Sequence, residues 1–347
     1  MNPMAMTTIL FSILMGPLIT MMSSHTIMMW IGLEMNMLAI IPILTNNHNP
    51  RSTEAATKYF LSQATASMIL MLAITNNFLH TNQWTLLHNT DSMTNMLMTI
   101  SMIMKLGAAP FHFWVPEVTQ GIKTSSGLIL LTWQKIGPLS ILYQLSNATN
   151  HNIMLISASL SILLGAWGGL NQTQLRKIMA YSSIAHMGWM LAIMTFSPHI
   201  MLLNLTIYIT LTLCMFTTMT FNSMTTTLSM SIMWNKMPMM ILTMLISLLS
   251  LGGLPPLTGF LPKWTIINDL ISNNNLITSL TMAITALINL FFYMRIVYST
   301  SLTMFPSFNN SKLTWHQTNP KNITLMAPLT ITTSLSLPLA PLLSTLM

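Results

Sequence analysis

The sequence predicts an all-α protein that crosses a membrane many times. Of its 347 residues, 52% are hydrophobic and only 5% are charged, whereas about 25% of the residues of a soluble domain are charged. The mean hydropathy is +0.62, and apolar runs long enough to cross a bilayer recur along the whole chain. We therefore expect a single membrane domain over residues 1–347.

A helix needs about 20 mostly apolar residues to cross a bilayer. This criterion predicts about eleven spans. In chain order they are 4–22, 25–44, 57–79, 93–118, 125–145, 152–170, 177–196, 199–222, 238–270, 275–298 and 325–345. The first run lacks the basic stretch and the cleavage site of a signal peptide, so we expect it to be a retained helix.

The fourth and ninth spans contain residues that break helices. They include "GAAPFHFWVPEV" and "LGGLPPLTGFLPKW" respectively. Proline removes a backbone donor, and in lipid the freed carbonyl must find protein or water. We expect two broken helices that line hydrated cavities. A plain proline kink in a packed helix is the alternative at either position.

The two broken spans lie five spans apart in the predicted order. Because five is an odd number, equivalent helices in two such units would point in opposite directions across the membrane. This pattern predicts an inverted repeat, as found in transporters with sites near the midplane. The units would be 1–145 and 150–298, followed by a loop and a C-terminal helix in 299–347.

Most basic residues fall in connections on one side of the membrane, and the connections on the other side contain none. The residues on the basic side are Arg51, Lys58, Lys123, Arg176, Lys177, Lys236, Arg295, Lys312 and Lys321. Basic loops mark the cytoplasmic or matrix side, so the N terminus is expected there and the C terminus opposite. The cations are scattered singly, which argues against a nucleic-acid partner. The single cysteine, Cys214, argues against an iron–sulfur cluster or a structural zinc.

Four ionisable residues lie inside predicted spans: Glu34, Lys105, Lys135 and Lys263. Each would cost about 2.5–3.5 kcal/mol in lipid if it were unpaired. Burial disfavours the charged form of a lysine, and an approaching carboxylate restores it. These groups therefore predict a proton relay whose occupancy responds to neighbouring charge. The alternative is structural, with Glu34 paired to Lys105 and the other two lysines reaching an interface.

Two histidines in the spans are candidate proton shuttles, because histidine titrates near neutral pH. They are His112, directly after the first break, and His186 in "SSIAHMGWM". Each is equally well explained as a hydrogen-bonding group between helices. Arg51, Glu54 and Lys58 have helical spacing, and we interpret them as a solvated, salt-bridged face.

Four motifs together resemble the antiporter-like membrane-arm subunits of mitochondrial NADH:ubiquinone oxidoreductase, respiratory complex I. They are "MKLGAAPFHFWVPEV", "LLTWQKIGPLS", "NQTQLRKIMAYSSIAHMGW" and "GGLPPLTGFLPKW". The resemblance covers essentially the whole chain. It implies that Glu34 and Lys105 match the family's glutamate–lysine pair, Lys135 its central lysine and Lys263 its distal one. His112 and His186 match polar positions along the same axis.

The resemblance implies a core subunit of an H⁺-translocating NADH:ubiquinone reductase in the inner mitochondrial membrane. No cofactor or metal is expected on this chain, while NADH, FMN, iron–sulfur clusters and ubiquinone are expected on partner chains. Expected partners are neighbouring antiporter-like chains, other membrane-arm and accessory subunits, and membrane lipid. The N terminus would face the matrix and the C terminus the intermembrane space. The alternatives are a stand-alone cation/proton antiporter and a purely structural membrane-arm subunit.

Overall fold

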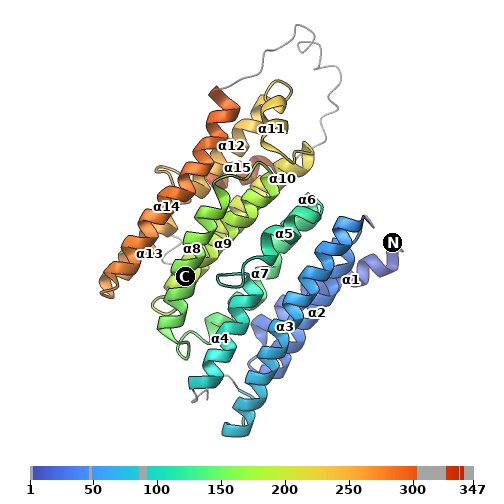
Figure 1. Ribbon diagram of the computed structural model, residues 1–347, viewed down its shortest axis with the longest axis vertical. Helices are drawn as coiled ribbons and strands as arrows, with labels where there is room; N and C mark the ends of the chain where they lie inside the picture. Colours follow the sequence, from blue (N-terminus) through green and yellow to red (C-terminus); the bar gives the residue numbers. More distant parts are fainter. Residues whose placement is uncertain (1–2, 47–48, 86–91, 303–325, 336, 340–347) are drawn as a thin grey trace. The chain divides into compact units, whose positions relative to one another are not determined.

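The protein is almost entirely helical, which confirms the predicted all-α membrane class. The computed structural model describes residues 3–46, 49–85, 92–302, 326–335 and 337–339 (Figure 1). Within these ranges, β pairing is confined to two isolated bridges. Five described helices are continuous and apolar enough to cross a bilayer: Pro3–Met22 (α1), Thr26–Leu44 (α2), His151–Gly169 (α8), Pro198–Phe221 (α10) and Leu276–Leu302 (α14 with the π-helix that follows it). The total of eleven spans stays a prediction.

The chain divides into two compact units, Met1–Leu164 with Ser183–Pro198, and Gly165–Ser182 with His199–Met347. Besides α1 and α2, the first unit contains α3 (Pro50–Thr81), α4 (Ser92–Leu106), α5 (Trp114–Gly121), α6 (Thr124–Leu131) and α7 (Trp133–Gln144). Besides α10, the second contains α11 (Thr227–Met233), α12 (Pro238–Gly252), α13 (Phe260–Ser272), α14 (Leu276–Val297), η2 (Tyr298–Leu302), α15 (Met326–Leu335) and η4 (Leu337–Leu339). Helices α8 and α9 (Leu175–Met194) contribute to both. The division into two compact units does not test the predicted inverted repeat, which concerns symmetry within the chain, so the repeat stays a prediction.

Most predicted spans coincide with helices to within a few residues. Helix α3 starts earlier than predicted, at Pro50, because proline suits the first helical turn, where its missing N–H is not needed. Helix α11 lies in a stretch predicted to be a connection, and Thr226 and Ser229 form a capping box at its start. The last predicted span, 325–345, is described only over 326–335 and 337–339.

The break in the fourth predicted span is confirmed between α4 and α5. Helix α4 ends before Gly107, whose φ of 69° is left-handed and strained for any other residue. The amide of Ala108 donates to the carbonyl of Ile103 at 3.1 Å, and that of Gly107 to Met104 at 3.1 Å. This is a Schellman motif, which satisfies carbonyls that the helix end leaves open. A new helix, α5, begins at Trp114.

The break in the ninth predicted span, between α12 and α13, repeats this backbone pattern. Gly253 is left-handed at φ 81°. Its amide donates to Ser250 at 2.9 Å, and the amide of Leu254 donates to Leu249 at 3.3 Å. Helix α13 begins at Phe260, at the same spacing from the glycine as in the first break. Two separate stretches of sequence therefore end a helix in the same way.

A third interruption, which the sequence did not predict, divides span 125–145 at Thr132. Pro138 has no N–H to offer to the carbonyl of Gln134. The hydroxyl of Thr132 donates to the carbonyl of Leu128 at 2.7 Å, a side-chain bond that commonly bends helices. The interruption places Lys135 in the first turn of α7.

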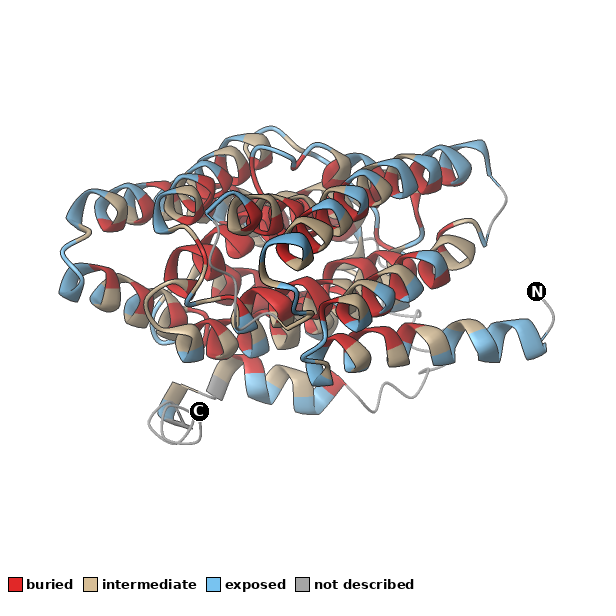
Figure 2. Cartoon of the chain, turned by 90° about the horizontal axis from the view of Figure 1, so that it is seen from below, coloured by how far each residue is buried: buried red, intermediate tan, exposed pale blue. Residues whose placement is uncertain are grey.

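Along many helices, buried residues alternate with exposed ones (Figure 2), and many of the exposed residues are apolar. Phe11, Leu61 and Met68 of the first unit are 64%, 63% and 71% exposed, and Ile277 of the second is 80% exposed. Apolar exposure on this scale would cause a soluble protein to associate. In a bilayer these side chains can contact lipid without penalty.

Candidate functional site

Two of the predicted lysines, Lys105 and Lys135, line one cavity inside the first unit. Its volume is about 20 Å³, which is room for one or two water molecules, because a single water needs roughly 10–15 Å³. Side chains from α2 to α7 enclose it. The lining residues are Leu33, Asn36, Met37, Tyr59, Gln63, Lys105, Leu106, Trp114, Val115, Leu130, Gln134, Lys135 and Pro138.

Lys105 reaches this cavity from the last turn of α4, and only 7% of its surface is exposed. The helix stops one residue later because Gly107 turns the chain, and a helix C terminus favours a nearby cation. The carbonyl of Lys105 accepts a hydrogen bond from Nε2 of Gln63 at 3.4 Å. The first break therefore places the buried amine of Lys105 and the capped C terminus of α4 at the wall of this cavity.

Glu34 lies in α2 beside the cavity, between Leu33 and Asn36, which both line it. Its charge attracts that of Lys105. Among the described residues, however, ion pairs within 4.0 Å join Lys58 to two other glutamates and do not include Glu34. One carboxylate oxygen of Glu34 is buried without a hydrogen-bond partner. The two groups of the predicted pair are thus coupled by charge without direct contact.

Lys135 is 6% exposed and extends from α7 towards α9. Its Nζ donates to the carbonyl of Ser183 at 3.5 Å. His186, which is 7% exposed, lies one turn further along α9, on the same face of that helix as Ser183. Lys135 therefore reaches the turn of α9 that carries the predicted histidine.

Sequence reasoning missed the neutral polar side chains that line this cavity together with the two lysines. Nε2 of Gln134 donates to Oδ1 of Asn36 at 2.8 Å. The hydroxyl of Tyr59 donates to Oε1 of Gln134 at 3.5 Å. Together with Gln63, these residues give the cavity a hydrogen-bonding surface. The available signal was their position: each is a polar residue inside a predicted span and within five residues of a charged one.

His112 lies in the stretch between α4 and α5 and is 5% exposed. Its Nδ1 is 3.3 Å from the carbonyl oxygen of Pro110, and its ring centroid is 4.1 Å from that of Phe113. The residues that line the cavity do not include His112. The structure thus gives this histidine a local hydrogen bond at the break, while its predicted role in proton transfer stays a prediction.

Lys263 belongs to the second unit, where it binds the end of the broken helix. Its Nζ donates to the carbonyls of Gly252 at 2.7 Å and Leu251 at 3.1 Å. These carbonyls belong to the last turn of α12, where no further turn of helix follows to supply amide donors. A cation is also favoured at this end of the helix dipole. Lys263 therefore caps the half-helix that precedes its own.

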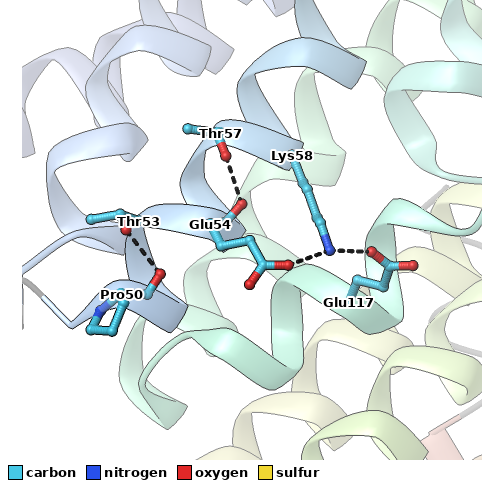
Figure 3. A network of polar contacts seen from close by, with 6 residues as sticks. All are labelled: Pro50, Thr53, Glu54, Thr57, Lys58 and Glu117. Atoms are coloured by element: carbon cyan, nitrogen blue, oxygen red, sulfur yellow. Dashed lines mark hydrogen bonds and ion pairs between the residues drawn. The ribbon is translucent and has the colours of Figure 1, made fainter.

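A polar cluster lies at the start of α3 and on α5 (Figure 3). Nζ of Lys58 is 2.6 Å from Oε1 of Glu54, the helical pair expected from the spacing. It is also 2.8 Å from Oε2 of Glu117, a contact across two helices that sequence reasoning missed. The hydrogen bond and the charge of Lys58 hold the pKa of the Glu54 carboxyl below its usual value. Glu54 is therefore ionised at neutral pH.

The described part of the chain contains no group of three or more histidine, cysteine, aspartate or glutamate residues that could hold a metal ion.

Comparison with known proteins matches this chain to a family of membrane subunits. The model described as "NADH:quinone oxidoreductase/Mrp antiporter, TM" matches residues 23–331. NADH-ubiquinone oxidoreductase chain 2 of Oryctolagus cuniculus is 62% identical over 346 residues, which cover 100% of both chains.

Two solved structures share the fold at low sequence identity. One is a chain of respiratory complex I from Thermus thermophilus, with a TM-score of 0.79 and 23% identity, covering 95% of this chain and 78% of that one. The other belongs to the Mrp complex of Dietzia sp. DQ12-45-1b, with a TM-score of 0.76 and 13% identity, covering 86% of this chain and 60% of that one.

Proposed function

We infer that this chain, which belongs to the NADH:quinone oxidoreductase/Mrp antiporter transmembrane family, is a core membrane-arm subunit of respiratory complex I. As part of an H⁺-translocating NADH:ubiquinone reductase, it carries protons across the inner mitochondrial membrane while electrons pass from NADH to ubiquinone. NADH, FMN, the iron–sulfur clusters and ubiquinone are bound by other chains. The name and full-length identity of the rabbit relative support this function.

The observation that carries the proposal is the pair of buried lysines on one water-sized cavity. A buried amine holds a proton only weakly, so a nearby charge can decide whether the proton stays. Glu34 is coupled to Lys105 by charge without touching it, which suits a contact that forms and breaks. When Glu34 moves away, Lys105 releases its proton, Lys135 responds across the cavity, and a proton passes towards Lys263. His112 and His186 are shuttles on this route.

The orientation in the membrane follows from the loop charges. The N terminus and the basic connections face the matrix, and the C terminus faces the intermembrane space. Neighbouring antiporter-like chains, other membrane-arm subunits, accessory subunits and lipid cover the exposed apolar side chains of each unit.

The test replaces the central amine in the assembled complex. Lys135→Met keeps the length of the side chain and removes its charge, so we expect assembly to persist and fewer protons to be pumped per NADH oxidised. Lys123→Met is the matched control, because Lys123 is exposed at the start of α6. Proton uptake into reconstituted vesicles and NADH oxidation are measured together. An unchanged ratio for Lys135→Met would remove this lysine from the relay.

A stand-alone cation/proton antiporter is the second candidate, favoured by the fold shared with the Dietzia Mrp chain. A native gel of mildly solubilised membranes separates the two. Migration with a large band that oxidises NADH supports the complex I subunit. Migration as a small species, followed by cation-dependent proton flux in liposomes, supports the antiporter. A purely structural subunit would keep normal pumping after neutralisation of all four charged residues in the relay.

A further inference from the structure

A second, larger cavity opens at the surface of the first unit, around the polar cluster of Figure 3. This outer cleft has a volume of about 360 Å³ and is open to solvent. It is lined by Arg51, Glu54, Ala55, Lys58, Glu117, Gln120 and Gly121. The lining therefore contains two carboxylates bound to one ammonium, with a second cation beside them.

The outer cleft and the cavity of Lys105 are formed by the same two helices. On α3, Lys58 lines the outer cleft and the next residue, Tyr59, lines the inner cavity. On α5, Glu117 lines the outer cleft, while Trp114, one turn earlier, lines the inner cavity. One helical turn rises about 5 Å, so roughly one layer of side chains separates the two spaces.

On the side of the inner cavity, these helices carry two aromatic residues. Tyr59 and Trp114 meet edge to face, with ring centroids 5.8 Å apart. Nε1 of Trp114 is buried, and no described residue accepts a hydrogen bond from it. A buried donor of this kind is normally satisfied by protein or ordered water. The inner cavity, which Trp114 lines, has room for that water.

The ion pairs of this cluster contribute little to the stability of the fold. An exposed ion pair contributes only about 0–1 kcal/mol, and the side chains of Lys58, Glu54 and Glu117 are 42%, 62% and 54% exposed. The position of the cluster, beside residues that line the Lys105 cavity and on the predicted side of the basic connections, favours a role in supplying protons.

We propose that the outer cleft is the proton uptake site for the Lys105 cavity and that Tyr59 and Trp114 are the partition between them. A proton from water binds a carboxylate oxygen of Glu117 or Glu54, and that oxygen leaves the Lys58 ammonium. The two rings then move apart, and the proton passes through water to the neutral amine of Lys105. The emptied carboxylate rebinds Lys58. This inference rests on the proposed function, since it needs Lys105 to accept protons.

The test removes the two carboxylates and keeps their shape, with Glu54→Gln and Glu117→Gln combined in the assembled complex. We expect the loss of NADH-driven proton flux at about pH 8 and its substantial return at about pH 6, because collecting groups matter most when protons are scarce. Lys58→Gln breaks both ion pairs but keeps both carboxylates, so its flux should fall less than that of the double variant. Asp269→Asn is the matched control, a carboxylate-to-amide change in α13 of the second unit.

Each outcome decides between explanations. Normal flux in the double variant overturns the uptake site, and the proposed function still stands if Lys135→Met lowers pumping. Equal damage from Lys58→Gln and from the double variant identifies a structural clamp between α3 and α5 and also overturns the uptake site. Normal pumping in both the double variant and Lys135→Met would instead contradict the proposed function.

Discussion

Replacement of Lys263 by methionine should open the break between α12 and α13. The change removes two hydrogen bonds from an ammonium, to the carbonyls of Gly252 at 2.7 Å and Leu251 at 3.1 Å. A hydrogen bond to a charged group contributes about 1.5–3 kcal/mol, so the two together contribute about 3–6 kcal/mol. If no other donor replaces them, the break should open about 10²- to 10⁴-fold more often, because each factor of ten in an equilibrium corresponds to about 1.36 kcal/mol.

Amide hydrogen exchange of the assembled complex measures this opening. The amides of Gly253 and Leu254 are the reporters, because they bond back to the last turns of α12. The amide of Ala108 serves as an internal control, since it makes the equivalent bond at the first break. Lys263→Arg keeps the charge and the donors, so it should exchange nearly as the native chain does. Unchanged exchange in Lys263→Met would refute the capping role.

Gly253→Ala separates the capping role from proton transfer. A Cβ at Gly253 would lie 2.9 Å from Nζ and 2.8 Å from Cδ of Lys263, so the amine must move although its chemistry is intact. The left-handed backbone at this position adds about 1–2 kcal/mol of strain for alanine. We expect faster exchange at the break here too. A pumping defect shared by Gly253→Ala and Lys263→Met would come from the position of the amine rather than from its loss.

Three further predictions concern the first unit. Gln134→Leu leaves Oδ1 of Asn36 buried without its donor, so thermal unfolding should reveal a loss of about 1–3 kcal/mol. Gly188→Ala places a methyl group 2.1 Å from a serine hydroxyl of α8. Overpacking of this kind lowers stability by about 1–3 kcal/mol. A normal melting temperature would show that α8 can shift to accommodate the methyl group. The pKa of Glu54 is lowered, so its ion pair with Lys58 stabilises the fold at pH values above the usual carboxyl pKa. This stabilisation disappears as the pH falls through the lowered pKa. The variant Glu54→Gln should therefore lack this acid dependence of unfolding.

The features that the sequence predicted well have strong local signals. A lysine in an apolar run is visible because its cost in lipid is large. This signal singled out Lys105 and Lys135, which are buried, and Lys263, which caps a helix end, while their role in a relay stays a prediction. Glycine next to proline likewise marked both broken helices, and the structure confirms them at Gly107 and Gly253. Each of these signals depends on one or a few adjacent residues.

The features that the sequence missed depend on contacts between distant residues or on weak local signals. Gln63 and Gln134 are neutral, so no charge penalty draws attention to them, and their partners lie on other helices. The contact between Lys58 and Glu117 joins residues on two helices, and it depends on the direction of α5 after the break. The interruption at Thr132 contains neither glycine nor an adjacent proline, so the pattern predicted a continuous helix.

The two breaks share a backbone pattern but differ in the donor that caps them, and this difference separates the roles of their lysines. At the first break a neutral amide, Nε2 of Gln63, binds a carbonyl at the end of α4, so the ammonium of Lys105 is not needed there. At the second break Lys263 itself binds the carbonyls of α12. A neutral amine retains two N–H donors but loses the added strength of a charged donor. In the proposed relay, release of a proton would therefore weaken the helix end at Lys263 and leave the helix end at Lys105 intact. Proton transfer would then be tied to backbone opening only at the second break.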